Sequence, residues 1–171
     1  MEDNYDISLL KSKKKKVNSR TKGSTFERSI AAQLNDRFKT SDFSRTPGSG
    51  AFASTHKLPE HLKIYGDLIT PKNFKYCIEC KKGYNKESLY SLMNYSSEFW
   101  NFIDQCQKDS DRANKSPLII FKQDRQPTLA IVSYDAGYRS NNYIELKRET
   151  RTYRMYLFDE ILNEEDSLWV Y

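Results

Sequence analysis

Apolar residues recur at helical spacing near the start of the chain. The four positions are Phe26, Ile30, Leu34 and Phe38. Residues four apart fall on one face of a helix, so this spacing predicts an amphipathic helix over residues 24–38. Ser24 is a suitable N-cap for this helix, and Glu27 follows three residues later, as in a capping box.

Residues 74–81 alternate with a period of two. One set is apolar (Phe74, Tyr76, Ile78 and Cys80), and the other is mostly charged (Lys75, Cys77, Glu79 and Lys81). Because successive side chains of a strand point to opposite faces, this pattern predicts a strand with one apolar face. Two shorter strands are expected upstream, at residues 42–46 and 67–70.

The rest of the pattern alternates between helical and extended segments. The expected elements are a long helix over 87–112 with a break near Asn94, strands at 117–122 and 128–134, one or two strands over 143–157, and a short helix over 158–163. A Pro-Gly-Ser-Gly break at residues 47–50 begins a long loop that ends near residue 65. This order predicts an α/β fold, a sandwich with a central mixed β-sheet flanked by helices.

Charge is distributed unevenly along the 171 residues. Residues 1–22 carry seven Lys or Arg and three Asp or Glu, while residues 155–171 carry five acidic residues and no Lys or Arg. We therefore expect a disordered basic N-terminal arm, followed by a single domain over residues 23–171 with an acidic C-terminal end. The net charge of +5 favours a polyanionic partner, nucleic acid before membrane, although solubility alone would also account for it.

Several classes of protein are excluded by the sequence. The longest apolar runs, such as Leu118 to Phe121, are too short to span a bilayer, and the N-terminus has no apolar signal-peptide core. Three cysteines are too few for a disulfide scaffold, so we expect an intracellular chain with reduced thiols. The chain also lacks a nucleophile elbow and a Gly-rich phosphate loop, which argues against Ser hydrolases and NTPases.

Asp67, Glu79 and Lys81 are the sharpest candidates for catalytic residues. Two carboxylates on neighbouring strands can bind one hard divalent cation such as Mg²⁺. Glu79 and Lys81 are two residues apart and share a face of the predicted strand, so an ammonium group would stand beside that cation. Metal-assisted attack on a phosphodiester needs this combination. The same Glu and Lys could also form an ordinary ion pair on a solvent face.

Aromatic residues gather in the helix expected over residues 87–112. They are Tyr90, Tyr95, Phe99, Trp100 and Phe102. Aromatic rings can stack on nucleobases, which would suit a protein that binds nucleic acid. The same rings could instead belong to the core or to a dimer interface, and the sequence leaves these alternatives open.

Four segments resemble those of a known nuclease superfamily. Residues 66–69 with residues 76–81 resemble the D…ExK core of the restriction-endonuclease-like, or PD-(D/E)xK, nucleases, although Gly66 stands where the namesake motif has proline. The opening of the first helix at residues 22–28, and Arg45 followed by Ser49, look like the start of archaeal-type (Hjc-like) Holliday junction resolvases. Phe99-Trp100 with Gln105, followed by residues 115–122, is similar to resolvases from phage genomes. The resemblance covers roughly residues 20–135.

This resemblance implies a role for each matching residue at the metal centre. Asp67 and Glu79 would be metal ligands, with the Cys80 backbone carbonyl as a further ligand. Lys81 would be the catalytic lysine. Glu27 would reach from the first helix to a second metal ion or a water molecule, although it could equally serve only as the capping partner of the helix.

The resemblance also implies the contacts made to DNA. Ser49 would sit in a catalytic loop near the scissile phosphate, and Gln105 would reach the site from the second long helix. Arg28 and Arg45 would contact phosphates. Apart from the resemblance, we expect Lys22 and Lys82 to bind DNA as well. Arg45 could instead be a surface charge, and Gln105 an ordinary polar residue of its helix.

The function implied is that of a metal-dependent, structure-selective DNA endonuclease that uses Mg²⁺, with Mn²⁺ as a substitute. It would resolve four-way (Holliday) junctions by paired symmetric hydrolysis of phosphodiester bonds. We expect it to act as a homodimer in the cytoplasm of a prokaryotic host, with no membrane as a partner. The two-fold symmetry of a junction matches that of a dimer. A nuclease of the same superfamily acting in restriction, repair or packaging is the first alternative, and a non-catalytic DNA-binding module is the second.

Overall fold

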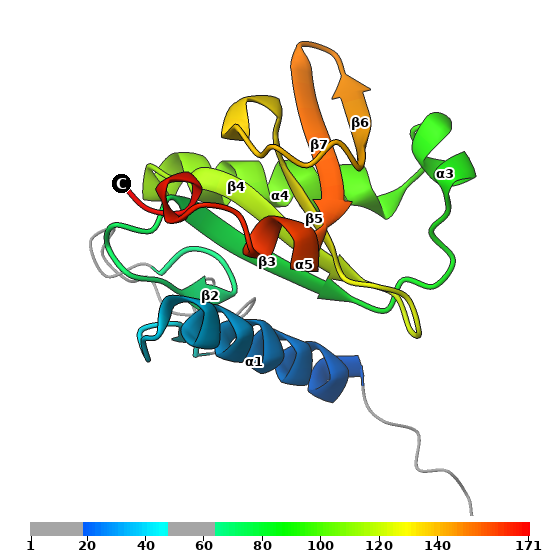
Figure 1. The fold of residues 1–171 in the computed structure, drawn as a ribbon. Helices are drawn as coiled ribbons and strands as arrows, with labels where there is room; N and C mark the ends of the chain where they lie inside the picture. The colour runs from blue at the N-terminus through cyan, green and yellow to red at the C-terminus, as the bar shows by residue number, and fades with distance from the viewer. Residues whose placement is uncertain (1–18, 48–63) are drawn as a thin grey trace, which may run out of the picture.

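A five-stranded mixed sheet forms the middle layer of the computed structural model, which describes residues 19–47 and 64–171 (Figure 1). The strands, in spatial order, are β3 (Tyr76–Lys82), β4 (Ser116–Lys122), β5 (Leu129–Ser133), β7 (Arg151–Leu157) and β6 (Tyr143–Arg148). β3 and β4 are parallel, and every later pair is antiparallel. The predicted α/β sandwich with a central mixed sheet is confirmed.

Helices cover the two faces of this sheet. α1 (Ser19–Phe38) packs on one face, together with the short α5 (Phe158–Leu162). α4 (Glu98–Ala113) packs on the other face and, after the short α3 (Leu89–Met93), carries the chain from β3 to β4. Parallel strands need such a crossover, because a tight turn cannot join them. None of the helices within the described ranges is long and apolar enough to cross a membrane.

Each face of the sheet has its own hydrophobic core. The α1 side buries Phe26, Ile30 and Leu34 against β3, β4, β5 and β7, whereas the α4 side buries Phe99, Ile103 and other residues of that helix. β3 is therefore buried on both faces, and its first five residues are all buried. The alternation along β3 is therefore between apolar and polar side chains, and not between buried and exposed ones, because Glu79 stands on a buried face among apolar neighbours.

The start of α1 differs from the prediction. The helix begins at Ser19, so Ser24 lies inside it and is not its N-cap, and residues 19–22 are helical instead of belonging to the arm. The Ser24 hydroxyl donates to the carbonyl of Thr21 at 3.3 Å, a local bond that a serine inside a helix can make. The capping box with Glu27 therefore does not form. The rest of the predicted arm, residues 1–18, lies outside the described residues.

The expected break in the second helical segment is confirmed. α3 ends at Met93, and α4 begins at Glu98 with Ser97 as its N-cap, the hydroxyl of which accepts from the backbone N–H of Phe99 at 3.1 Å. The strands predicted upstream are shorter than expected. They form a two-stranded antiparallel ribbon of β1 (Ser44–Arg45) and β2 (Leu68–Ile69) that lies beside β3.

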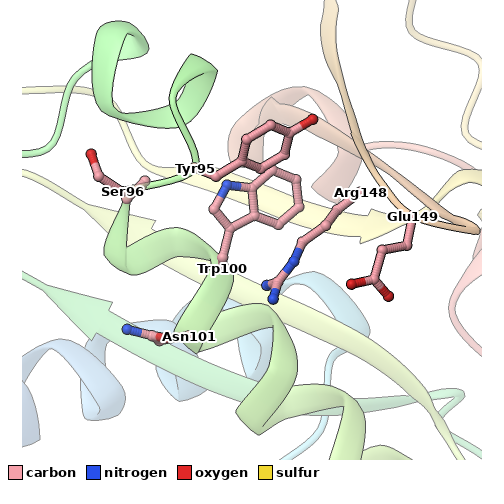
Figure 2. Close-up of a pocket in the computed structure, with 7 residues that line it drawn as sticks. Tyr95, Ser96, Trp100, Asn101, Arg148 and Glu149 are labelled. Carbon is pink, nitrogen blue, oxygen red and sulfur yellow. The ribbon is translucent and has the colours of Figure 1, made fainter.

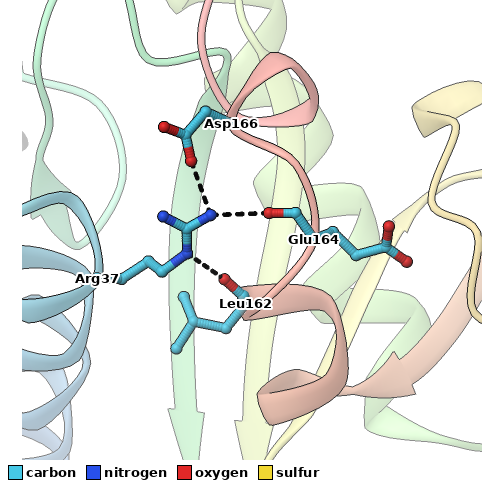
Figure 3. Close-up of polar contacts among 4 residues, drawn as sticks. All are labelled: Arg37, Leu162, Glu164 and Asp166. Carbon is cyan, nitrogen blue, oxygen red and sulfur yellow. Dashed lines mark hydrogen bonds and ion pairs between the residues drawn. The ribbon is translucent and has the colours of Figure 1, made fainter.

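The acidic C-terminal end folds back onto α1 and β3. Arg37 of α1 donates to the carbonyl oxygens of Leu162 and Glu164, at 2.8 Å each, and forms an ion pair with Asp166 at 2.7 Å (Figure 3). Beyond the turn η4 (Asp166–Leu168), Trp169 is fully buried in the α1-side core. The segment is thus part of the domain's core.

Candidate active site

Asp67 is held between the β1–β2 ribbon and the edge of β3. Its backbone N–H donates to the carbonyl of Ile78 at 2.8 Å, and its carbonyl accepts from the N–H of Thr46 at 2.9 Å. Its side chain accepts a hydrogen bond from the backbone N–H of Cys80 at 2.9 Å. Three bonds thus fix the carboxylate against the outer edge of β3.

Gly66 makes this placement of Asp67 possible. Its φ is +78°, and a Cβ added there would meet the Ile78 carbonyl oxygen at 2.7 Å and the Cys77 Sγ at 2.9 Å. Proline cannot take its place in this conformation, because its ring fixes φ near −65°. The glycine that replaces the proline of the namesake motif is therefore required by the local turn.

Glu79 and Lys81 project from the α4 side of β3. The Glu79 side chain is only 4% exposed, and its Oε1 lies 2.5 Å from the Lys81 Nζ. Lys81 also donates to the Oε1 of Gln105 on α4 at 3.1 Å, and its Nζ lies 5.2 Å from the centre of the Phe102 ring. The ammonium group is thus held between a buried carboxylate and an amide from the facing helix.

Glu27 and Arg45 approach from the α1 side. Glu27 is buried on α1 and forms a close ion pair with Arg45 of β1. Both charges lie close enough to Asp67 to act on it, because the Glu27 carboxylate raises the pKa of Asp67 and the Arg45 guanidinium lowers it. The structure thus gathers side chains from α1, β1, β3, α4 and the segment before β2.

Burial leaves the two central carboxylates short of compensating charge. Burial, with the nearby Glu27 carboxylate, raises the pKa of Asp67 to about 6, against the hydrogen bond from Cys80. Burial and the Asp67 carboxylate raise the pKa of Glu79 to about 7, against the Lys81 ammonium. Burial disfavours the Lys81 ammonium, but the Glu79 and Asp67 carboxylates together outweigh it, so the pKa of Lys81 is raised. The site therefore favours the addition of positive charge.

Comparison with known proteins identifies the family of this site. Residues 18–167 match the family described as "Phage putative PDDEXK endonuclease". The chain belongs to this family. It is also 35% identical over 127 residues to Protein D14 of Escherichia phage T5. This alignment covers 70% of the present chain and 74% of Protein D14. No solved structure matches the chain.

The resemblance to PD-(D/E)xK nucleases and to phage proteins is thereby confirmed. The match spans all the described elements that build the site, from α1 to the end of the sheet. It supports a nuclease of a superfamily that generally uses divalent metal ions. The match names no DNA structure as a substrate.

The donors at this site suit Mg²⁺. Within residues 19–47 and 64–171, no three His, Cys, Asp or Glu side chains are grouped as a metal site. The two carboxylates closest to Lys81 in its electrostatics are Glu79 and Asp67. The Cys80 carbonyl lies on the same edge of β3 as the N–H that bonds Asp67, because both groups of a strand residue point to one side. Mg²⁺ in proteins is commonly bound by one or two carboxylates, with water and substrate phosphate completing its coordination.

Three residues predicted to bind DNA lie apart from this centre. Lys22 lies 3.6 Å from an Asp124 carboxylate oxygen in the β4–β5 turn, and Arg28 is exposed on α1. Lys82 points to the opposite face of β3 from Lys81, with its Nζ 5.7 Å from the centre of the Phe26 ring. Ser49, predicted to lie in a catalytic loop, is outside the described residues.

Near the centre, Asp109 was not singled out from the sequence, and Phe102 was named only among the aromatic residues of its helix. Asp109 lies one turn beyond Gln105 on α4, burial raises its pKa, and its charge contributes to the raised pKa of Glu79. Phe102 lies beneath the Lys81 ammonium. Spacing along the helix could have pointed to Asp109, because residues four apart share a face.

Proposed function

We propose that this phage endonuclease resolves four-way DNA junctions, with Asp67, Glu79 and Lys81 as its hydrolytic centre. One observation carries the assignment of the centre: the Lys81 ammonium is fixed between Glu79 and Gln105, beside an Asp67 carboxylate tied to the same strand. Two buried carboxylates with one oriented cation are the groups that metal-assisted attack on a phosphodiester requires.

Asp67, Glu79 and the Cys80 carbonyl would hold a divalent cation, Mg²⁺ by preference with Mn²⁺ as a substitute. When bound, that cation supplies Lewis-acid stabilisation of the charge that develops on the phosphate. The protein's own part is to hold its donors rigidly. The hydrogen bond from the Cys80 N–H keeps the Asp67 carboxylate at the strand edge, and burial prevents the Glu79 side chain from turning toward solvent.

Lys81 would place a positive charge near the reacting phosphate oxygens. Charge stabilisation of this kind is effective when the group is oriented in advance, because no reorganisation is then needed during the reaction. Gln105 provides that orientation through its 3.1 Å bond to the ammonium, and the Phe102 ring closes the other side. Gln105 is therefore a positioning residue for Lys81 in this proposal.

Arg45 would contact a phosphate that flanks the scissile bond. Its guanidinium comes from β1 and is paired with Glu27, which holds it on the α1 side of the centre. Glu27 would thus position Arg45, in addition to the contact with a water molecule or second metal ion that the resemblance implies. Arg28, Lys22 and Lys82 would contact phosphates farther from the cut.

A homodimer would explain paired cleavage at a junction. A four-way junction has two-fold symmetry, and two opposed cuts need two centres related by the same symmetry, as in an isologous dimer. Recognition would follow the shape of the junction through phosphate contacts instead of base sequence. Binding should therefore weaken as salt concentration rises, because phosphate contacts release counterions.

A cleavage assay tests this proposal. Labelled four-way junctions, linear duplexes and single strands are incubated with the protein in Mg²⁺ or in EDTA, beside the variants Lys81→Ala and Lys72→Ala. Lys72 is an exposed lysine in the turn before β3, which makes it a matched control for the loss of one positive charge. We expect symmetric nicks confined to junctions, lost in EDTA, reduced about 10²–10³-fold by Lys81→Ala and unchanged by Lys72→Ala.

The other outcomes lead to different functions. Equal cutting of linear duplex would keep the nuclease and overturn junction selectivity, as expected of an enzyme of restriction, repair or packaging. Tight DNA binding without cutting under any condition would indicate a binding module that has kept the fold. Cutting that persists in Lys81→Ala would place the hydrolytic centre elsewhere.

A further inference from the structure

A cavity of about 470 Å³ opens where the start of α4 meets the β6–β7 hairpin (Figure 2). Its lining includes Tyr95, Ser96, Trp100, Asn101, Arg148 and Glu149. The volume lies in the range of pockets that receive small molecules or single groups of larger ligands. None of these residues belongs to the centre around Asp67 and Glu79, and the proposed function assigns them no role.

Tyr95 is displayed at this cavity against the preference of its backbone. It follows α3 as the first residue beyond the C-cap, with φ of +58°. Its N–H donates to the carbonyl of Leu92, and the N–H of Ser96 donates to that of Ser91, the two bonds of a Schellman motif. Glycine is the usual residue at this position. Here the position holds a tyrosine that is 62% exposed. The chain therefore places an exposed aromatic ring at a backbone conformation that favours glycine.

Trp100 and Arg148 complete a stack beside Tyr95. The Tyr95 and Trp100 ring centres are 5.7 Å apart, and the Arg148 guanidinium carbon lies 5.6 Å from the centre of the Trp100 ring. Arg148 is held there by Asp104 at 3.1 Å. In Figure 2 the Trp100 Nε1 faces the segment of Tyr95 and Ser96. This N–H is buried and has no hydrogen-bond partner among residues 19–47 and 64–171.

The cavity lies close to the proposed hydrolytic centre. Asn101, which lines it, and Gln105, which bonds Lys81, are both exposed and stand about 6 Å apart along α4, just over one helical turn. On the other side, the tip of the β6–β7 hairpin carries the exposed basic residue Arg151. A strand of DNA whose backbone crosses the centre could therefore place a neighbouring base in the cavity.

We propose that this cavity receives one unpaired nucleobase of the DNA substrate, stacked on Tyr95 and Arg148. Every base has a π-face that stacks on aromatic and guanidinium planes, so such a site accepts bases without regard to sequence. Arg151 would contact an adjoining phosphate. This inference rests on the proposed function and deepens it, because it names unpaired nucleotides at a branch point as the feature recognised.

The conformation of Tyr95 provides a clean test. Tyr95→Gly removes the ring and suits a backbone with positive φ, so its melting temperature should equal or exceed that of the parent. In this test the parent and the Tyr95→Gly variant both carry Lys81→Ala, so that binding is measured without cleavage. The probes are a four-way junction with 2-aminopurine at the branch point and a plain duplex carrying the same base.

We expect the parent to bind the junction and change the 2-aminopurine fluorescence. Tyr95→Gly should bind the junction about ten-fold more weakly, the size expected for loss of one base stack, and should lose the fluorescence change. Affinity for the duplex should be the same in both. Tyr95→Phe, which keeps an aromatic ring, should restore both signals, and Tyr95→Asn, which also tolerates positive φ, should behave like the glycine variant.

The failures of the two proposals are distinguishable. Equal junction affinity and fluorescence in Tyr95→Gly would overturn the base site, and so would an equal loss of affinity for duplex and junction. In either case, junction cleavage by the protein with Lys81 intact would leave the proposed function standing. If the parent changes the fluorescence and Tyr95→Gly does not, that difference would support the base site even if no cleavage of any DNA were found.

Discussion

Two regions of the molecule partner their charged groups in opposite ways. At the Arg37 clamp, made by Arg37, Leu162, Glu164 and Asp166, one guanidinium finds two backbone carbonyls and one carboxylate at 2.7–2.8 Å (Figure 3). At the centre, Asp67 and Glu79 are more deeply buried, and the Asp67 carboxylate raises the pKa of Glu79. The Lys81 ammonium acts on both carboxylates, and the Arg45 guanidinium acts on Asp67. The charge of the Arg37 guanidinium at the clamp is satisfied, whereas the Asp67 and Glu79 carboxylates at the centre are incompletely neutralised.

This difference separates stability from function. A buried charge stabilises a fold only when its partners replace the water it has lost, and otherwise burial is a cost. The clamp joins the C-terminal segment to α1 and closes a core that contains Trp169. In the function that we propose, this cost has a purpose, because an incompletely neutralised pair of carboxylates attracts a divalent cation. Substitutions should therefore act on stability at the clamp and on activity at the centre.

The largest effect is expected from neutralising the carboxylates. Asp67→Asn and Glu79→Gln should each lower DNA cleavage about 10²–10³-fold or more, because the amide no longer attracts a cation. Without metal, urea denaturation should show stability equal to that of the parent or up to about 2 kcal/mol higher, because a neutral amide needs no counter-charge. Asp36→Asn, on an exposed aspartate paired with Lys39, should change neither quantity. A large loss of stability in either variant would make the carboxylates structural.

A glycine pair tests how Asp67 is placed. Gly66→Ala should cost about 2–4 kcal/mol, because it combines positive φ with a Cβ at 2.7 Å from the Ile78 carbonyl oxygen. Gly83→Ala is the matched control: its φ is +101°, but nothing lies within 4 Å of the added Cβ, so only about 1–2 kcal/mol is expected. Cleavage per folded molecule should fall only in Gly66→Ala, because only that change displaces Asp67. Equal activity losses in the two variants would contradict this account.

Breaking the clamp should lower the free energy of unfolding by less than Gly66→Ala does, and it should leave catalysis unchanged. Arg37→Met should lower the free energy of unfolding by about 2 kcal/mol, because two carbonyls and one carboxylate lose a charged donor. Arg139→Met removes an arginine that pairs with Glu165 in the same C-terminal segment, but that pair is exposed, so less than about 0.5 kcal/mol is expected. Urea denaturation gives both values. Cleavage per folded molecule should be unchanged in both variants, and a selective loss in Arg37→Met would link the clamp to the centre.

The sequence indicated the parts of this comparison that depend on local pattern. The periods of Phe26 to Phe38 and of residues 74–81 predicted α1 and β3, and the spacing of Glu79 and Lys81 placed both on one face of the strand. The clamp was not predicted, because Arg37 and Asp166 are distant in sequence and no periodicity links them. The start of α1 was missed because Ser24 makes its local bond inside the helix, where sequence alone suggests a cap.

The pairing of Glu27 with Arg45 illustrates the same limit at the site. The resemblance assigned both residues, yet their ion pair depends on how α1 packs against the β1–β2 ribbon. Tyr95 is a second case. Its aromatic character was evident from the sequence, but its positive φ and its place beside Trp100 follow from the turn between α3 and α4.

The smallest effect is a pH dependence that sharpens the comparison. The pKa values of Asp67 and Glu79 are raised to about 6 and about 7, from ordinary values of 3.8 and 4.5. Between about pH 4 and pH 7 the folded protein therefore binds more protons than the unfolded chain, so stability from this pair is present at low pH and is lost as pH rises. In EDTA, the urea midpoint should fall between about pH 5 and pH 8. Added Mg²⁺ should raise the midpoint more at the higher pH, where both carboxylates are ionised.

The double variant Asp67→Asn, Glu79→Gln isolates this contribution from that of other titrating groups. Its midpoint should fall less with pH than that of the parent, and Mg²⁺ should no longer raise it. Arg37→Met should keep the parent's slope at lower overall stability, because the guanidinium at the clamp stays charged throughout this range. A parent midpoint that rises between about pH 5 and pH 8 in EDTA, relative to the double variant, would show that the centre already holds enough positive charge, and the contrast with the clamp would fail.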